Sequence, residues 1–353
     1  MSSCVSKYCQ PISFAKKDLI QGLDEILFLL KKGKFVIHKE QEDGHTAIEE
    51  YLTKKLGAKG KKNHTGRSRN DQILVTLRLY TLNMLSIIQG LVKDAMQIIH
   101  KQSQKWIHQK MPGYTHTQKA MPTTVGIWLS SFSDALADDL VLLTAVQKII
   151  DQNPLGSGAG FGTSVIPVDR AYTTRQLGFA KTQNNPIYCA HSRGKFENMV
   201  LQVFNNIMLD IGKCANDLVW FTSKEFDFFD FPETYKTGSS MMPNKHNFDV
   251  LELLRGNVSI FLGYQYQIQE VIKNLFSGYN RDLQLTKEPY IKALTLFIET
   301  VQVFILCMKH LEIHPDKLNK ACTDELYATE KTLKLVQTGV PFRQAYKYVK
   351  KHL

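Results

Sequence analysis

The sequence lacks the features that mark membrane-spanning and secreted chains. Its longest apolar runs, such as residues 303–308, are far too short to cross a bilayer. The first ten residues, MSSCVSKYCQ, contain no apolar stretch of the kind that a secretory signal requires. The six cysteines are scattered without the spacing of a disulfide framework, which is typical of free thiols in a reducing compartment. We therefore expect a soluble, cytoplasmic protein with no membrane partner.

Signatures of metal and nucleotide cofactors are also missing. None of the eleven histidines belongs to a His-Glu-x-x-His motif or lies beside a Cys-x-x-Cys pair, so we expect no metal site. A cluster of alternating glycines at 156–162 fails the dinucleotide fingerprint, because Phe161 or Thr163 takes the place of its third glycine. These glycines indicate close backbone approach in a loop instead, and we expect no cofactor.

Positive charge is in excess, with 44 Lys and Arg against 33 Asp and Glu and a formal net charge of +11. This balance favours an anionic partner, which could be nucleic acid, a membrane surface or a small acidic molecule. The basic residues between Lys54 and Arg69 make the best case for nucleic acid, but no helix-turn-helix or RNP-type signature accompanies them. A site for a small polyanion explains them at least as well, and a solvated loop explains them without a ligand. We expect no nucleic-acid partner.

Long proline-free segments with helical periodicity fill most of the chain. Apolar residues recur every three or four positions from Ile73 to Leu91, from Phe196 to Phe221 and from Ile291 to Met308. This is the period of one helix face, and no comparable period-two segment is visible. The fold class is therefore predicted to be all-α.

The helix expected to begin near Asn70 carries two apolar stripes. One runs from Ile73 to Leu91 and the other from Leu82 to Ile99, each in steps of three and four. A helix that is apolar on more than one side must be covered on more than one side. Packing between subunits would provide that cover, and the alternative is a central helix of a large monomer. We favour an oligomer.

The junctions between the expected helices are polar and rich in chemistry-bearing residues, as functional loops often are. The loop GSSMMPNKHN at 238–247 is the most suggestive. Ser239 would become a base only if its alkoxide were stabilised by a nearby ammonium, such as Lys245, and by loop amides. The ordinary alternative is a glycine–serine turn that caps the helix starting near Phe248.

Taken together, the loops resemble one family. The segments HTGRSRNDQ, MPGYTHTQ, PLGSGAGFGT, GSSMMPNKHN and YNRDLQLTKEP occur in the order found in argininosuccinate lyases of the fumarase/aspartase superfamily. The resemblance runs from about Pro11 to the C-terminus. It implies a homotetramer around a central bundle of long helices, with each active site built from loops of three subunits. It also implies reversible β-elimination of argininosuccinate to arginine and fumarate, the last step of arginine biosynthesis, without metal or organic cofactor.

The resemblance carries site residues over motif by motif. Ser239 matches the catalytic serine of the loop, and His116 matches the catalytic histidine. Which of them moves which proton stays open, although chemistry favours Ser239 near the Cβ proton and His116 on the leaving side, directly or through water. The residues matched to substrate binding are Ser68, Arg69, Asn70, Thr115, Lys245, Asn247, Tyr279, Gln284 and Lys287, with His45 as a supporting histidine.

The same resemblance implies three parts for the chain. These are a shortened N-terminal helical domain over residues 1–68, a central helical bundle over 69–315 and a partial C-terminal helical domain over 316–353. Family members extend further at both ends, so the chain is expected to be short there. One alternative is a catalytically impaired, crystallin-like structural relative on the same scaffold. Another is a sister lyase acting on a different fumarate-releasing substrate, which the motifs HTGRSRNDQ and YNRDLQ oppose.

Overall fold

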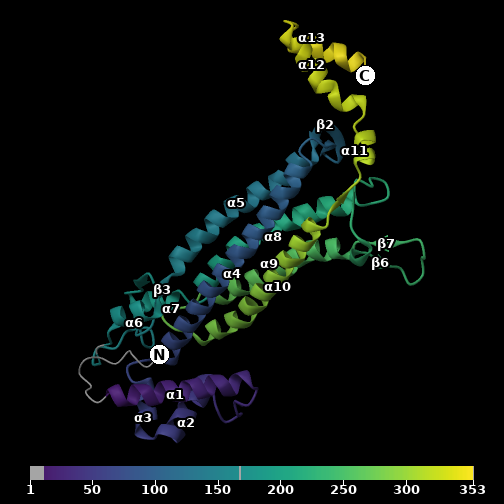
Figure 1. The fold of residues 1–353 in the computed structure, drawn as a ribbon. Coiled ribbons are helices and arrows are strands. Elements are labelled where there is room, and N and C mark those ends of the chain that lie inside the picture. The colour runs from purple at the N-terminus through teal and green to yellow at the C-terminus, as the bar shows by residue number, and fades with distance from the viewer. Residues whose placement is uncertain (1–11, 167, 353) are drawn as a thin grey trace. The chain divides into compact units, whose positions relative to one another are not determined.

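A computed structural model describes residues 12–166 and 168–352 of the chain (Figure 1). Over these residues the structure contains thirteen α-helices, four short 3-10 helices and eight strands of two to seven residues. The predicted all-α fold class is therefore confirmed. The cysteines at positions 4 and 9 lie outside the described residues. The remaining four are free thiols, and Cys189, Cys214 and Cys307 are buried.

The chain divides into two compact units, each made of three separate segments. The first unit contains Met1–Leu85, Ala145–Met199 and Gln267–Glu288. The second contains Ser86–Thr144, Val200–Tyr266 and Pro289–Leu353. The longest helices contribute turns to both units. The predicted division at residues 68 and 315 follows the order of the chain instead, and it stays a prediction.

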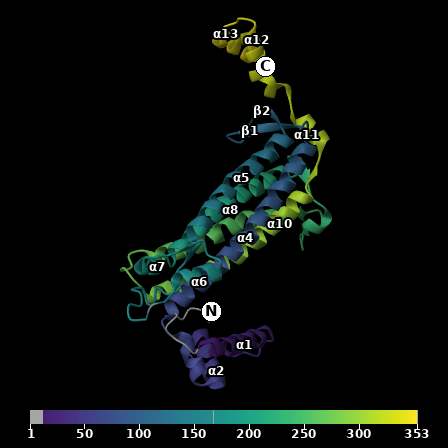
Figure 2. The same cartoon turned by 60° about the vertical axis from the view of Figure 1, so that its left-hand side comes forward.

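Five long helices run side by side in the second unit, as Figures 1 and 2 show. They are the later turns of α4 (Arg69–Lys105), most of α5 (Val125–Ile150) and of α8 (Lys195–Phe221), and most of α9 (Asp249–Ile272) and α10 (Lys287–Lys309). Their periodic apolar faces meet in one core, as the spacing of the sequence predicts. At its centre, Phe204 of α8 stacks on Phe297 of α10 with ring centroids 4.3 Å apart.

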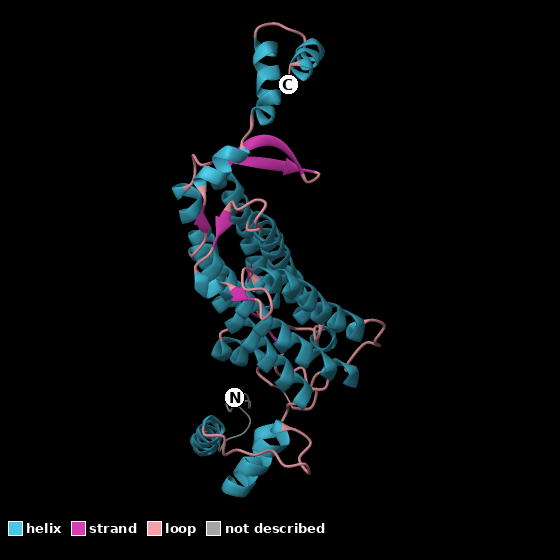
Figure 3. Ribbon diagram, turned by 90° about the vertical axis from the view of Figure 1, so that its right-hand side faces the viewer, coloured by secondary structure: helices cyan, strands magenta, loops and turns pink. Residues whose placement is uncertain are grey.

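Short elements occupy the ends of these helices. Strands β1 (Lys110–Thr115) and β2 (Gln118–Thr124) form an antiparallel hairpin, drawn in magenta in Figure 3, where the sequence indicated only a polar loop. The remaining elements of the unit are β5 (Phe229–Asp230), η2 (Glu233–Tyr235), β6 (Thr237–Gly238), β7 (His246–Asn247), β8 (Glu312–Ile313), α11 (Pro315–Ala321), η4 (Asp324–Tyr327), α12 (Ala328–Gln337) and α13 (Phe342–Lys351).

The first unit joins an N-terminal helical cluster to the first turns of α4. In the cluster, Leu19 and Ile26 of α1 pack against Leu52 of α2. The elements of the unit outside the long helices are α1 (Ile12–Lys31), α2 (Gly44–Leu56), α3 (Ala58–Lys61), η1 (Lys62–His64), β3 (Gln152–Asn153), α6 (Arg170–Leu177), β4 (Lys181–Thr182), α7 (Pro186–His191) and η3 (Arg281–Thr286). Strands β3 and β4 pair in parallel and carry the loop that approaches the start of α4.

The two apolar stripes of α4 differ in how deeply they are buried. Leu85, Ile88 and Val92 of the second stripe are completely buried within the chain. On the first stripe, Tyr80 and Ile87 stay 37% and 48% exposed. The chain itself therefore buries the second stripe and covers the first only in part, since its other members are half-buried.

Two surface features bear on the expected partners. Part of the basic segment is neutralised, because Lys59 of α3 forms an ion pair of 2.6 Å with Asp18 and Lys55 pairs with Glu25. Two stretches, Arg69–Lys105 and Arg281–Lys309, contain windows with mean hydropathy of 1.3 and 1.8 and are long and apolar enough to cross a membrane by composition. Core helices of soluble proteins pass the same test, so this is weak support for a membrane span, and the predicted lack of a membrane partner stays a prediction.

Candidate active site

The first turn of α4 is fixed to a distant loop by one buried carboxylate. Asp71 accepts a hydrogen bond of 2.9 Å from the Ser68 amide, which caps the helix start. Its other oxygen accepts bonds of 2.9 and 3.0 Å from the amides of Gly156 and Gly158. Burial raises the pKa of Asp71, and these three amide donors oppose the rise. Asp71 thereby holds Asn70 beside the glycine loop.

The glycine loop approaches α4 because its backbone has an unusual shape. Gly156, Gly158, Gly160 and Gly162 all have positive φ, between 63° and 110°. Residues with a Cβ rarely adopt this region, so glycine is required at these turns. A Cβ on Gly156 would also lie 2.9 Å from the Arg170 side chain. The prediction of close backbone approach is confirmed here.

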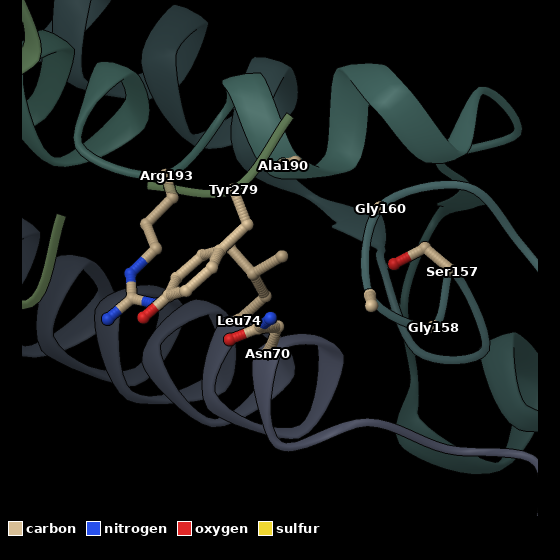
Figure 4. A pocket seen from close by; sticks show the side chains of 9 residues that line it. Asn70, Leu74, Ser157, Gly158, Gly160, Ala190, Arg193 and Tyr279 are labelled. Carbon is tan, nitrogen blue, oxygen red and sulfur yellow. The ribbon is translucent and has the colours of Figure 1, made fainter. Parts of the chain in front are cut away.

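A narrow pocket opens between this loop and the segment around Tyr279 (Figure 4). Asn70 and Leu74 of α4 form one wall, Ser157 and Gly158 another, and Tyr279 the third. Gln284 donates a hydrogen bond of 3.1 Å to the Tyr279 hydroxyl, so two predicted binding residues contact one another. The remaining lining residues are Ala159, Gly160, Ala190 and Arg193.

Two basic side chains, Arg69 and Lys287, lie near His45 in the same unit. His45 lies in the first turn of α2, which Asp43 caps by accepting bonds from the amides of His45 and Thr46. Burial lowers the pKa of His45; Asp43 opposes this effect, whereas Arg69 and Lys287 reinforce it. Arg69 pairs with Glu42 and donates a bond of 2.9 Å to the Thr46 hydroxyl. In this structure Arg69 is therefore held by the N-terminal cluster.

Thr115 and His116 lie at the tip of the β1–β2 hairpin in the second unit. Thr115 pairs with Gln118, so His116 and Thr117 form a two-residue turn, and both are exposed. Their φ values are 54° and 61°, a region that favours glycine or asparagine and that the primed hairpin turns require. The hairpin thus presents the imidazole outward at the cost of backbone strain.

Ser239, Lys245 and Asn247 belong to the loop between β6 and β7. The Ser239 hydroxyl oxygen accepts hydrogen bonds from the amides of Met241 (3.3 Å) and Met242 (3.0 Å). Lys245 follows a turn closed by its own amide on the Met242 carbonyl (3.1 Å), and its side chain is exposed. The loop therefore places two amide donors on the serine oxygen. An ordinary serine turn has the same bonds, so the role of Ser239 as a base stays a prediction.

The base of that loop is fastened in two places. The Thr237 hydroxyl donates a bond of 2.6 Å to Asp249 in the first turn of α9. Next to it, the Lys236 ammonium lies 3.1 Å from the Asp230 carboxylate and 2.9 Å from that of Glu233. These bonds tie the base of the loop to α9 and to the segment around Asp230 and Glu233.

The predicted residues fall into three groups within one chain. His45, Ser68, Arg69, Asn70, Tyr279, Gln284 and Lys287 belong to the first unit. The hairpin tip and the β6–β7 loop both belong to the second unit, on separate elements that lie apart in Figure 1. No cluster of three metal-ligating side chains occurs among residues 12–166 and 168–352.

Sequence reasoning missed two residues of the site. Asp71 stands inside the motif HTGRSRNDQ, but nothing in the motif indicates its bonds to residues 85 and 87 positions away. Arg193 lines the pocket from the turn between α7 and α8, and no local pattern marks it.

Comparisons with known proteins agree with these motifs. The chain matches a family described as Lyase over residues 5–263. It is 42% identical over 334 residues to the argininosuccinate lyase of Thermotoga neapolitana, which covers 95% of this chain and 84% of that protein. The argininosuccinate lyase of Xanthomonas campestris pv. campestris is 40% identical over 342 residues, covering 96% and 79%.

Solved structures share the fold at lower identity. An EDDS lyase in complex with formate matches with a TM-score of 0.86 and 21% identity, over 95% of this chain and 66% of that one. The 3-carboxy-cis,cis-muconate lactonizing enzyme of Pseudomonas putida matches with a TM-score of 0.76 and 15% identity, over 96% and 80%. The structures speak for the fold alone, whereas the sequence relatives identify the family more narrowly: this chain belongs to the argininosuccinate lyases of the fumarase/aspartase superfamily.

Proposed function

We propose that the protein is a carbon–nitrogen lyase that converts argininosuccinate reversibly to arginine and fumarate. A base removes a proton from the carbon beside a carboxylate, the carbon–nitrogen bond breaks, and the guanidino nitrogen leaves with a proton. The identity to argininosuccinate lyases over almost the whole chain carries this proposal. The reaction needs neither metal nor organic cofactor.

Ser239 is proposed as the group that removes the Cβ proton. A serine hydroxyl is a poor base unless its alkoxide is stabilised. The two amide donors from Met241 and Met242 point at the serine oxygen and would stabilise negative charge there, as an oxyanion hole does. Lys245 in the same loop supplies a positive charge for this oxygen or for a substrate carboxylate.

His116 is proposed to protonate the departing guanidino nitrogen, directly or through a water molecule. The strained hairpin turn supports this role, since strain at an exposed histidine has no structural purpose that a glycine would not serve better. The neighbouring Thr115 would contact the substrate from the same tip.

The remaining predicted residues are proposed to hold the three carboxylates and the amino group of the substrate. Asn70 and Tyr279 already line one pocket, and Gln284 orients the Tyr279 hydroxyl. Lys287 brings a positive charge close to His45, which is proposed as a supporting residue. The other proposed ligands are Ser68, Arg69, Lys245 and Asn247.

The active form is proposed to be a cytoplasmic homotetramer in which three subunits contribute loops to each site. The helices of the second unit support this assembly, because they leave large apolar side chains exposed: Val141 of α5 at 68%, Trp220 of α8 at 57% and Leu253 of α9 at 66%. The partly covered stripe of α4 adds Ile87. Apolar surface of this extent on long helices is typical of subunit interfaces.

Fumarate release from argininosuccinate, followed by the ultraviolet absorbance of fumarate, tests the activity. The substitution S239A is expected to lower kcat by a factor of about a thousand or more, because it removes the proposed base. S240A, one position along the same exposed loop, is the matched control and should retain turnover. A folded tetramer that binds argininosuccinate without releasing fumarate would instead support the crystallin-like structural relative.

A further inference from the structure

Arg193 is a buried arginine in the wall of the pocket that contains Asn70 and Tyr279. It is 2% exposed and lies in the tight turn between α7 and α8. The next residue, Gly194, has φ of 76°, and a Cβ there would lie 2.3 Å from Ile272. Close packing against the end of α9 therefore fixes the position from which the Arg193 side chain extends.

The guanidinium of Arg193 has donors without acceptors. None of its three nitrogens has a hydrogen-bond partner. The Tyr279 ring lies 5.4 Å from the guanidinium carbon, and its hydroxyl lies beside the group in Figure 4. Tyr279 and the buried carboxylate of Glu197 favour the charged form of Arg193, but neither makes a hydrogen bond of good geometry to it. Leaving a buried charged donor without a partner is costly, so such groups are usually paired.

The other buried arginine of this unit shows the usual solution. Arg78 of α4 donates to the carbonyls of Ile150 (3.0 Å) and Gln152 (3.1 Å) and to the Ser192 hydroxyl (3.2 Å). The fold can thus satisfy an arginine in this region with its own acceptors. At Arg193 the fold supplies an opposite charge, Glu197, but no acceptor in hydrogen-bonding geometry.

Close to Arg193 the pocket offers further donors for one small anion. The Asn70 amide and the Tyr279 hydroxyl gather with the guanidinium above the first turns of α4 (Figure 4). Because Gln284 donates to the Tyr279 oxygen, the hydroxyl proton of Tyr279 is available to another acceptor. The cavity of about 10 Å³ has room for one oxygen atom, so a carboxylate enters fully only if the glycine loop or the segment around Tyr279 moves outward.

We propose that Arg193 binds a carboxylate of the substrate, together with the Asn70 amide and the Tyr279 hydroxyl. A guanidinium pairs with a carboxylate through two parallel hydrogen bonds, which satisfies donors that the free protein leaves unpaired. This inference rests on the proposed function, because it assigns the subsite to argininosuccinate. It adds to the site a binding residue that the sequence motifs do not contain.

Calorimetric titration of the full-length protein with L-arginine and, separately, with fumarate tests the inference without turnover, since neither product reacts alone. In R193M the dissociation constant for one of the two is expected to rise about 10- to 100-fold, the usual loss for a charge-assisted pair. R193K keeps the positive charge but cannot form two parallel hydrogen bonds to a carboxylate, so its affinity should lie between those of wild type and R193M. The product that loses affinity identifies which carboxylate Arg193 holds.

R78M is the matched control for burial. It removes hydrogen bonds that the protein itself uses, so its melting temperature should fall while both products bind as tightly as to wild type. R193M removes a charge that also compensates the buried Glu197 carboxylate, so its melting temperature can fall as well, and the affinities for the two products are what separate it from R78M.

Three results would overturn the inference. They are equal affinities of R193M and wild type for both products, no binding of either product by wild type, and dissociation of the R193M oligomer in sedimentation. The last would mean that a partner subunit satisfies Arg193. Wild-type fumarate release from argininosuccinate is measured separately, so a failure of the proposed function is distinguishable from a failure at Arg193.

Discussion

Replacing Asp139 by asparagine is expected to stabilise the protein by an amount that depends on pH. The Asp139 carboxyl of α5 is 4% exposed and interacts with Asp210 of α8. Burial raises the pKa of Asp139 to about 7, and the charge of Asp210 adds to the rise. Burial also raises the pKa of Asp210. The two carboxyls are therefore poorly accommodated when both are ionised.

The magnitude follows from the two states of Asp139. In the unfolded chain it ionises near its ordinary pKa of 3.8, and in the folded chain near 7, so the folded chain holds the proton more tightly in between. The stability that this group contributes is complete below pH 3.8 and is lost as the pH rises towards 7. Since one pKa unit corresponds to about 1.4 kcal/mol, the loss reaches about 2 kcal/mol at pH 5.5 and about 4 kcal/mol at pH 8.

Urea unfolding at a fixed protein concentration, followed by tryptophan fluorescence, measures the effect. Trp128 of α5 donates a bond of 3.0 Å to Asp217 of α8, so it reports on the same helix pair. The gain of D139N over wild type should grow from about 2 to about 4 kcal/mol between pH 5.5 and pH 8. D134N, at an exposed position of α5, should show no such growth. A pH-independent difference, or a less stable D139N at pH 8, would refute the reasoning.

Two further substitutions test the site and its support. H116G is expected to raise the stability of the protein by roughly 1 kcal/mol, because glycine adopts positive φ freely, and to abolish fumarate release. T117G should raise the stability by a similar amount but leave fumarate release intact. Unchanged melting temperatures of both variants would contradict the assigned strain. D71N places an amide NH₂ against donors, including the Gly156 and Gly158 amides, so we expect a loss of about 2–3 kcal/mol and a higher KM; an unchanged melting temperature would contradict this.

The long helices could be predicted from the sequence because their apolar period is local information. Val200, Ile207 and Ile211 of α8 recur at the predicted spacing and are buried as expected. The stripes of α4 were equally visible, but which of them the chain covers depends on distant helices. The sequence therefore indicated an uncovered face without showing that it contains Ile87.

The candidate site could be predicted wherever a motif contains it and not where packing creates it. Ser239 was expected to need loop amides, and two such donors are present. The β1–β2 hairpin was not predicted, because its strands of six and seven residues include prolines and show no clear alternation. Arg193 could not be predicted at all, since its neighbours in the pocket, Asn70 and Tyr279, are far away in the sequence.

The contrast between Arg78 and Arg193 carries the functional argument furthest. Both are buried in the same unit, so burial of an arginine alone says nothing about binding. Arg78 donates its hydrogen bonds to backbone carbonyls of the protein, so a ligand could bind it only by breaking those bonds. Arg193 keeps its donors without hydrogen bonds beside Asn70 and Tyr279, so an incoming acceptor can use them without breaking a bond of the protein. Strain at His116 follows the same logic, so two unfavourable local arrangements lie where the substrate is proposed to bind and react.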